Sequence, residues 1–167
     1  MIKDKATLVS RFQQMVNLYG DRMALSAGDT SWTYREFDRK SDEAAAGLLA
    51  NGAEAGMKIG LWTGDTPEAM TFYMAILKTG ATAVMLNTSW TGQEVCERLL
   101  DSDVEMLIYN EGCKTMDFTV MCEQIHLPLL RKKIYIGNPS KHFEGIAMEK
   151  VIADGRKIPN SRLQMVK

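Results

Sequence analysis

The feature that most constrains this chain is a regular alternation of short apolar runs with longer helical segments through its central part. Four runs have the composition of strands, being rich in β-branched, aliphatic or aromatic residues: 58–62, 82–86, 105–109 and 132–136. Helical segments at 67–79 and 92–101 separate the first three of these runs. This strand–helix–strand order predicts an α/β fold, with a mostly parallel sheet and helices on both of its faces.

Capping sequences indicate where several of the helices begin. Thr33 and Glu36 have the spacing of a capping box, and Thr91 and Glu94 repeat that spacing. Pro67 suits the first position of a helix, where its missing N–H is not needed. These signals predict helix starts just after Thr33, near Pro67 and just after Thr91.

Weaker patterns flank the alternating region. Apolar residues recur every three or four positions over 8–19, which predicts an amphipathic helix. The turn-rich residues 27–30 predict a small hairpin. Toward the other end, 148–153 has the pattern of a short helix. We therefore expect an α/β subdomain over 1–155 and a connector over 156–167, where no periodicity is found.

The helix expected at 67–79 is apolar nearly all round. A helix of that kind is buried on several sides. In a small domain, a helix on a sheet normally shows one face to water, so we expect this helix to face a layer that lies outside the chain. Exposed apolar surface of this kind would also favour self-association, and a homo-oligomer is therefore one expected partner.

Charge and hydropathy exclude several classes of partner. The chain has 20 Lys and Arg against 21 Asp and Glu, a net charge of −1, so no long-range field draws it to nucleic acid or anionic lipid. The first residues lack the apolar core of a signal peptide. The most apolar stretch, 69–77, has about half the length that crosses a bilayer. We expect a cytoplasmic protein with no membrane span.

The segment 63–67 is the nearest candidate for a phosphate cradle, because it follows a strand and opens a helix. A cradle needs several glycines whose N–H groups converge on the anion. This segment has only Gly64, and Asp65 would repel a phosphate. A helix cap is therefore the preferred interpretation.

Other chemistry-bearing residues lack a functional pattern. The three cysteines have no metal-binding or redox spacing, and reduced thiols are expected: Cys96, Cys113 and Cys122. Structural or surface roles are expected for four further residues: His126, His142, Asp101 and Asp103. The basic run 131–133 is interpreted as protecting its strand from edge pairing. No catalytic, cofactor-binding or metal-binding residue is assigned.

Three stretches, in order, resemble the N-terminal part of the adenylate-forming superfamily, which includes acyl-CoA synthetases, peptide-synthetase adenylation domains and luciferases. Residues 32–37, WTYREF, are similar to the family's L-T-Y-x-E-L motif. Residues 58–68 resemble its G-D-x-V-A stretch ending in Pro-Glu, and 76–87 resemble its L-K-x-G-A segment. Asn87 favours the acyl-CoA synthetases, whereas Met85 stands where the family usually has Pro.

The resemblance implies a reaction in two halves. A carboxylate attacks ATP to give an acyl-adenylate and pyrophosphate, and the CoA thiol then displaces AMP. The family's phosphate loop, its Mg²⁺-serving Glu, its ribose-binding Asp and its C-terminal Lys have no counterpart in this sequence. We therefore expect an N-terminal fragment of an acid–CoA ligase that is inactive alone. The remainder of the parent polypeptide would be its partner, and the parent would use ATP, Mg²⁺ and CoA.

Two alternatives remain open at this point. The chain could be a free-standing interaction module that derives from this fold and binds a partner through an uncovered face. It could instead be a small flavodoxin-like domain, unrelated to the family, with ligands at the carboxyl ends of strands near Thr63 or Asn87.

Overall fold

The centre of the molecule is a five-stranded sheet whose neighbouring strands are all parallel. The computed structural model describes residues 6–113, 115–139 and 141–158. In spatial order the strands are β4 (Thr82–Met85), β3 (Lys58–Trp62), β5 (Met106–Tyr109), β8 (Lys132–Tyr135) and β9 (Ile146–Ala147). The predicted parallel sheet is confirmed. The sequence pattern missed β9, because a two-residue strand carries no detectable alternation.

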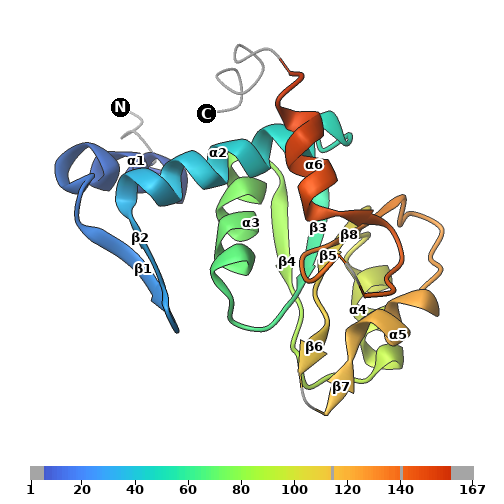
Figure 1. The fold of residues 1–167 in the computed structure, drawn as a ribbon. Coiled ribbons are helices and arrows are strands. Elements are labelled where there is room, and N and C mark those ends of the chain that lie inside the picture. The colour runs from blue at the N-terminus through green and yellow to red at the C-terminus, as the bar shows by residue number, and fades with distance from the viewer. Residues whose placement is uncertain (1–5, 114, 140, 159–167) are drawn as a thin grey trace.

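Helices cover both faces of this sheet, as predicted (Figure 1). The helices on one face are α2 (Tyr34–Ala50), α3 (Pro67–Lys78) and α6 (Met148–Gly155), and those on the other are α4 (Gly92–Asp101) and α5 (Phe118–Glu123). Side chains alternate between the faces along each strand. In β3, Ile59 and Leu61 join the core under α2 and α3, whereas Trp62 joins the core under α4 and α5.

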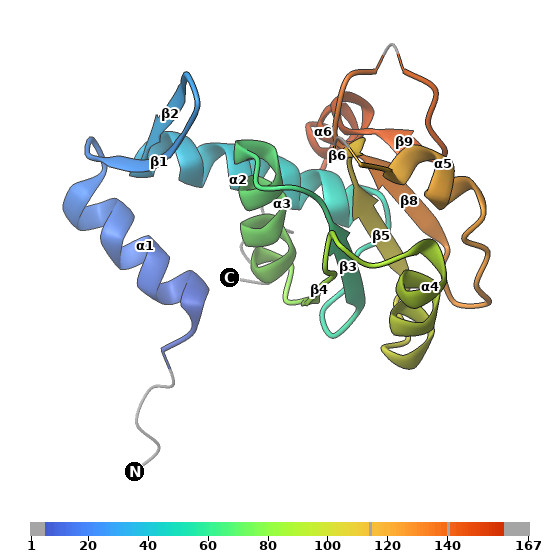
Figure 2. The ribbon, with the colours of Figure 1, turned by 90° about the horizontal axis from the view of Figure 1, so that it is seen from below.

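An N-terminal arm precedes the sheet. It consists of α1 (Leu8–Tyr19) and the antiparallel hairpin of β1 (Met23–Ala27) and β2 (Thr30–Thr33). Figure 2 shows this arm to one side of the sheet, connected to it through α2. Both arm elements confirm the sequence-based prediction. A second small hairpin, β6 (Gly112–Cys113) with β7 (Met116–Asp117), was not predicted.

The predicted capping boxes are both present. The Thr33 N–H donates to Glu36 Oε2 at 2.8 Å, and the Glu36 N–H donates to Thr33 Oγ1 at 3.2 Å. The same pair of bonds joins Thr91 and Glu94, at 2.8 and 3.4 Å. Each box satisfies N–H groups that a helix start would otherwise leave without acceptors.

The outer side of α3 is covered in part by the chain itself, and the expected layer from outside the chain stays a prediction. Met74 of α3 packs with Phe12 and Val16 of α1 in a separate apolar cluster. Among the apolar residues of α3, Met70 is the large side chain left substantially exposed, at 42%. The helix is apolar on several sides because it packs against the sheet, α2 and α1 together.

The edge-protection interpretation of the basic run 131–133 is wrong. Strand β8 lies between β5 and β9, and although its pairing with β9 begins only at Ile134, it is not the edge strand of the sheet. Lys133 has only 8% of its side chain exposed, and the Lys132 ammonium donates to the carbonyl of Asn51 at the end of α2. These two lysines tie β8 to neighbouring helices and loops.

Helices α2 and α6 cross at two glycines. A Cβ atom on Gly47 would lie 2.6 Å from the carbonyl oxygen of Val151, and one on Gly155 would lie 2.5 Å from the backbone nitrogen of Gly47. Helix α6 matches the short helix expected at 148–153, extended to Gly155. Most of the connector expected at 156–167 lies outside the described residues.

Candidate functional site

The carboxyl edge of the sheet is the place where an open α/β fold normally binds ligands. After β3 the chain enters α3 on one face, whereas after β5 it passes to α5 on the other. The strands therefore diverge to opposite sides between β3 and β5, which defines a topological switch point. The order of the first four parallel strands, with β3 between β4 and β5, is also that of flavodoxin-like sheets.

Aromatic side chains fill the space beside this switch point. The rings of Trp62 and Phe118 are stacked with their centroids 3.9 Å apart, and both side chains are fully buried. The Trp62 indole N–H donates to the carbonyl of Asn87 at 3.3 Å. Asn110, also buried, accepts from the N–H of Gly112 at 3.0 Å. The Trp62 indole and the Asn110 side-chain oxygen are thus both bonded within the protein.

The segment 63–67 forms a helix cap, as its sequence predicted. The Thr66 hydroxyl accepts from the N–H of Ala69 at 3.1 Å, and Pro67 is the first residue of α3. Its one glycine, Gly64, cannot by itself turn several N–H groups toward a common anion. The segment carries the geometry of a helix start and does not form a phosphate cradle.

Two buried tyrosines brace two different loops: Tyr109 holds the loop between β8 and β9, and Tyr135 holds the loop after β5. The Tyr109 hydroxyl donates to the Glu144 carbonyl at 2.6 Å and accepts from the Glu144 N–H at 3.0 Å. The Tyr135 hydroxyl donates to Glu111 at 3.1 Å. Burial raises the pKa of Tyr109, and burial together with the Glu111 carboxylate raises the pKa of Tyr135 to about 12. Both phenols are therefore neutral hydrogen-bonding groups at physiological pH.

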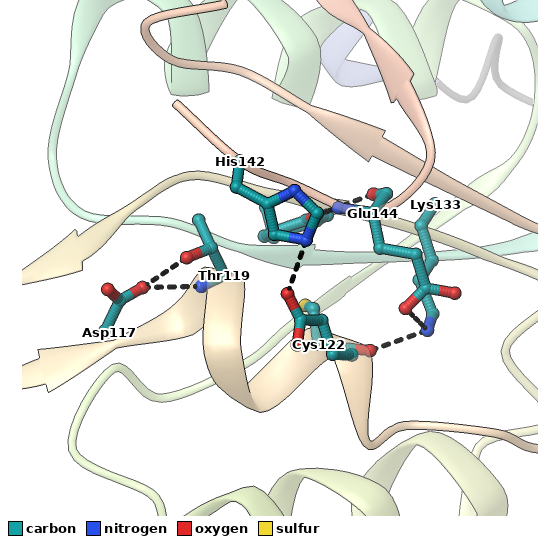
Figure 3. Close-up of polar contacts among 8 residues, drawn as sticks. Asp117, Thr119, Cys122, Lys133, His142 and Glu144 are labelled. Carbon is teal, nitrogen blue, oxygen red and sulfur yellow. Dashed lines mark hydrogen bonds and ion pairs between the residues drawn. The ribbon is translucent and has the colours of Figure 1, made fainter. Parts of the chain in front are cut away.

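Cys122 and Lys133 meet beneath the loop between β8 and β9 (Figure 3). The Lys133 ammonium donates to the Cys122 carbonyl at 2.6 Å and pairs with the Glu144 carboxylate at 2.8 Å. Burial raises the pKa of the Cys122 thiol well above its ordinary value, and burial also raises that of Cys96. A thiol that stays protonated is a poor nucleophile. The two cysteines whose side chains are described are free thiols, as predicted.

The remaining candidates have surface roles. His142 has 88% of its side chain exposed and lies 3.0 Å from Glu123 (Figure 3). Asp101 pairs with Arg98, and Asp103 pairs with Lys58 across the surface. His126 lines a hollow at the opposite edge of the sheet.

Asp117, which its sequence context did not single out, caps α5. It accepts from the N–H of Thr119 at 2.9 Å and from its hydroxyl, and these bonds lower the pKa of Asp117 (Figure 3). Within the described residues, no group of three or more His, Cys, Asp or Glu is placed to hold a metal ion. No helix in that part of the chain is long and apolar enough to cross a membrane.

Comparisons with known proteins identify relatives over most of the chain. The family described as AMP-binding enzyme matches residues 12–154. A medium/long-chain-fatty-acid–CoA ligase of Mycobacterium tuberculosis is 34% identical over 104 residues, which cover 62% of this chain and 17% of that protein. The 2,3-dihydroxybenzoate-AMP ligase of Bacillus subtilis is 26% identical over 143 residues, which cover 84% of this chain and 26% of that ligase.

A solved structure shares the fold. The anthranilate CoA ligase AuaEII, crystallised with anthranoyl-AMP, superimposes with a TM-score of 0.77 at 25% identity. The superposition covers 87% of this chain and 27% of that ligase. This chain therefore spans about a quarter or less of the length of these three relatives, and the region it matches is their N-terminal part.

Proposed function

Because this chain belongs to the family of AMP-binding enzymes, we propose that it is the N-terminal scaffold of a ligase that activates a carboxylic acid with ATP. In such a ligase the carboxylate attacks ATP, giving an acyl-adenylate and releasing pyrophosphate. The CoA thiol then takes the acyl group and AMP leaves. The assignment to the CoA ligases, which Asn87 favours, stays a prediction. The acid itself is not assigned.

The observation that carries this proposal is the family match over residues 12–154, together with a carboxyl edge that offers no phosphate cradle among the described residues. At the switch point, the stacked rings of Trp62 and Phe118 fill the space beside β3, and the following loop offers one glycine and the acidic Asp65. These residues do not fit a triphosphate, which needs converging N–H groups or cations. ATP, Mg²⁺ and CoA would therefore bind to other parts of the enzyme, and no step of the reaction is assigned to this chain.

A scaffold role agrees with what the side chains do. Tyr109, Lys133 and Glu144 use their polar groups to hold the loop after β8 against the sheet. The thiol of Cys122 and the phenol of Tyr109 are held neutral by burial. Neutral, buried hydrogen-bonding groups of this kind hold the backbone in place. A rigid backbone gives the other parts of an enzyme a fixed surface on which to pack.

The test is pyrophosphate exchange by the purified 167-residue chain. We expect no exchange into ATP above the enzyme-free rate with 2,3-dihydroxybenzoate, anthranilate or decanoate, and no rise in melting temperature with MgATP. The 2,3-dihydroxybenzoate-AMP ligase of Bacillus subtilis serves as the positive control. Exchange by the pure chain with any acid would overturn the proposal.

A second candidate function is a protein-interaction module. The arm favours it, because Leu18 and Met23 are 68% and 67% exposed, and large exposed apolar side chains in one region indicate contact surfaces. Docking of the remaining parent polypeptide and self-association would both use this surface. These partners, like the cytoplasmic location, stay predictions.

A further inference from the structure

A hollow of about 670 Å³ lies at the amino edge of the sheet. It forms where β8 extends past the start of β9, since pairing between these strands begins at Ile134 and Ile146. Residues of the loop 125–131 and residues 144–146 line this open hollow beside the unpaired beginning of β8. The volume is in the range of small-molecule sites, about 300–1,000 Å³, and the hollow is separate from the carboxyl edge of the sheet.

The lining of the hollow has an apolar part and a charged part. The apolar part is contributed by Ile125, Leu127, Leu130 and Ile146. Ile125 is buried, so this wall is anchored in the core under α5. An apolar wall with few polar groups at one end suits a ligand that has an apolar body and a polar head.

The charged part of the lining has an excess of positive charge. The lining residues include three cations and one carboxylate: Arg131, Lys132, Lys133 and Glu144. Lys133 already pairs with Glu144, and the Lys132 ammonium donates to Asn51. The Arg131 guanidinium keeps the most donor capacity of the three, since its side chain is 70% exposed and its ion pair with Glu105 is long, at 3.4 Å.

We propose that this hollow binds a small amphiphilic anion. The anionic head, a carboxylate or a phosphate ester, accepts hydrogen bonds from the Arg131 guanidinium. The apolar body lies on Leu127, Leu130 and Ile125. The inference depends on the residues of the hollow alone and stands whether or not the chain is part of an acid-activating ligase.

An NMR titration of backbone amides locates such a site. The probes are octanoate, octyl phosphate, octylammonium and octanol, each below its micelle concentration. We expect saturable shifts confined to residues 125–133 and 144–146 with the two anions, and the tighter of the two identifies the preferred head group. Equal binding of octylammonium or octanol, or shifts spread over the exposed Leu18 and Met23, would overturn the proposal.

Two substitutions give effects of opposite sign. Arg131→Gln weakens anion binding by about tenfold, the loss of one charge-assisted hydrogen bond. Glu144→Gln tightens it by about threefold, because a nearby like charge is removed, while the Tyr109 hydroxyl still holds the backbone of residue 144. The matched control is Arg98→Gln, which removes an ion-paired arginine outside the hollow and leaves binding unchanged. Weaker binding in the Glu144 variant, with unchanged binding in the Arg131 variant, would contradict the proposal.

Discussion

Lys78 shows how one residue can join two helices of this fold. Its ammonium, fully buried near the end of α3, donates to carboxylate oxygens of Asp38 and Asp42 at 2.7 and 2.6 Å, and to the Ser41 hydroxyl at 2.8 Å. The three acceptors belong to α2. A buried cation is tolerated only when its charge and hydrogen bonds are satisfied in this way.

Replacing Lys78 by Met should therefore be costly. We expect Lys78→Met to lower the free energy of unfolding in urea by about 3 kcal/mol, because it leaves two largely shielded carboxylates without their cation. The control, Lys150→Met, removes an exposed pair with Asp154 and should cost below about 1 kcal/mol. Equal losses in the two variants would contradict the account of this contact.

The capping-box glutamates make stability depend on pH. Hydrogen bonds from Thr33 and Thr91 lower the pKa of Glu36 and Glu94 from an ordinary value of 4.5. A lowered pKa in the folded state means that the stabilisation is present above pH 4.5 and is lost as the pH falls through the folded-state pKa. We expect the double variant Glu36→Gln, Glu94→Gln to lose less melting temperature than the parent between about pH 5 and pH 3. The same acid loss in both proteins would show that the boxes do not titrate in this way.

At the scale of elements, the contact of α2 with α6 depends on glycine. We expect Gly47→Ala to destabilise the fold by about 2 kcal/mol, because its Cβ would overlap the Val151 carbonyl and push α6 outward. Gly92→Ala is the matched control, since a Cβ there would meet Met121 at an ordinary 3.8 Å. Its free energy of unfolding should differ from that of the parent by less than about 0.5 kcal/mol. Unfolding in urea measures both, and a neutral Gly47→Ala would show that the helices are not held this closely.

Elements with their own local signal were predictable from the sequence. The capping boxes at Thr33 and Thr91 located two helix starts, and strand composition located β3, β4, β5 and β8. Elements defined by long-range contacts were missed. Strand β9 exists because Ile146 pairs with Ile134, and the packing of α1 against Met74 depends on tertiary structure. The basic run 131–133 was misread because a sequence does not show whether its strand is at an edge.

The candidate site shows the same limit. A phosphate cradle at 63–67 is unfavourable because the segment has one glycine and an acidic residue, so the sequence predicts a helix cap. The structure confirms the cap. The contact of Lys133 with Cys122 and Glu144 joins β8, α5 and the loop before β9, and it had no sequence signal beyond a lysine within an apolar strand. Hollows such as the one beside Arg131 arise where two strands differ in length, which only the folded chain reveals.

At the scale of the whole molecule, the chain forms a three-layer unit with an arm. Helices cover both faces of the sheet, and the arm lies to one side (Figures 1 and 2). Helix α1 of the arm packs against Met74 of α3. The unit matches about a quarter of an anthranilate CoA ligase. Its proposed role is therefore to position the later parts of the parent enzyme, without choosing the acid.

A chimera tests this role most directly. This chain would replace the matching 143-residue region of the Bacillus subtilis 2,3-dihydroxybenzoate-AMP ligase, and formation of the acyl-adenylate would be measured with several acids. The same ligase with the region deleted is the control and should be inactive. We predict a folded chimera that activates 2,3-dihydroxybenzoate with the host's preference among acids. A folded chimera that binds MgATP yet forms no acyl-adenylate, or that prefers a different acid, would contradict the scaffold role.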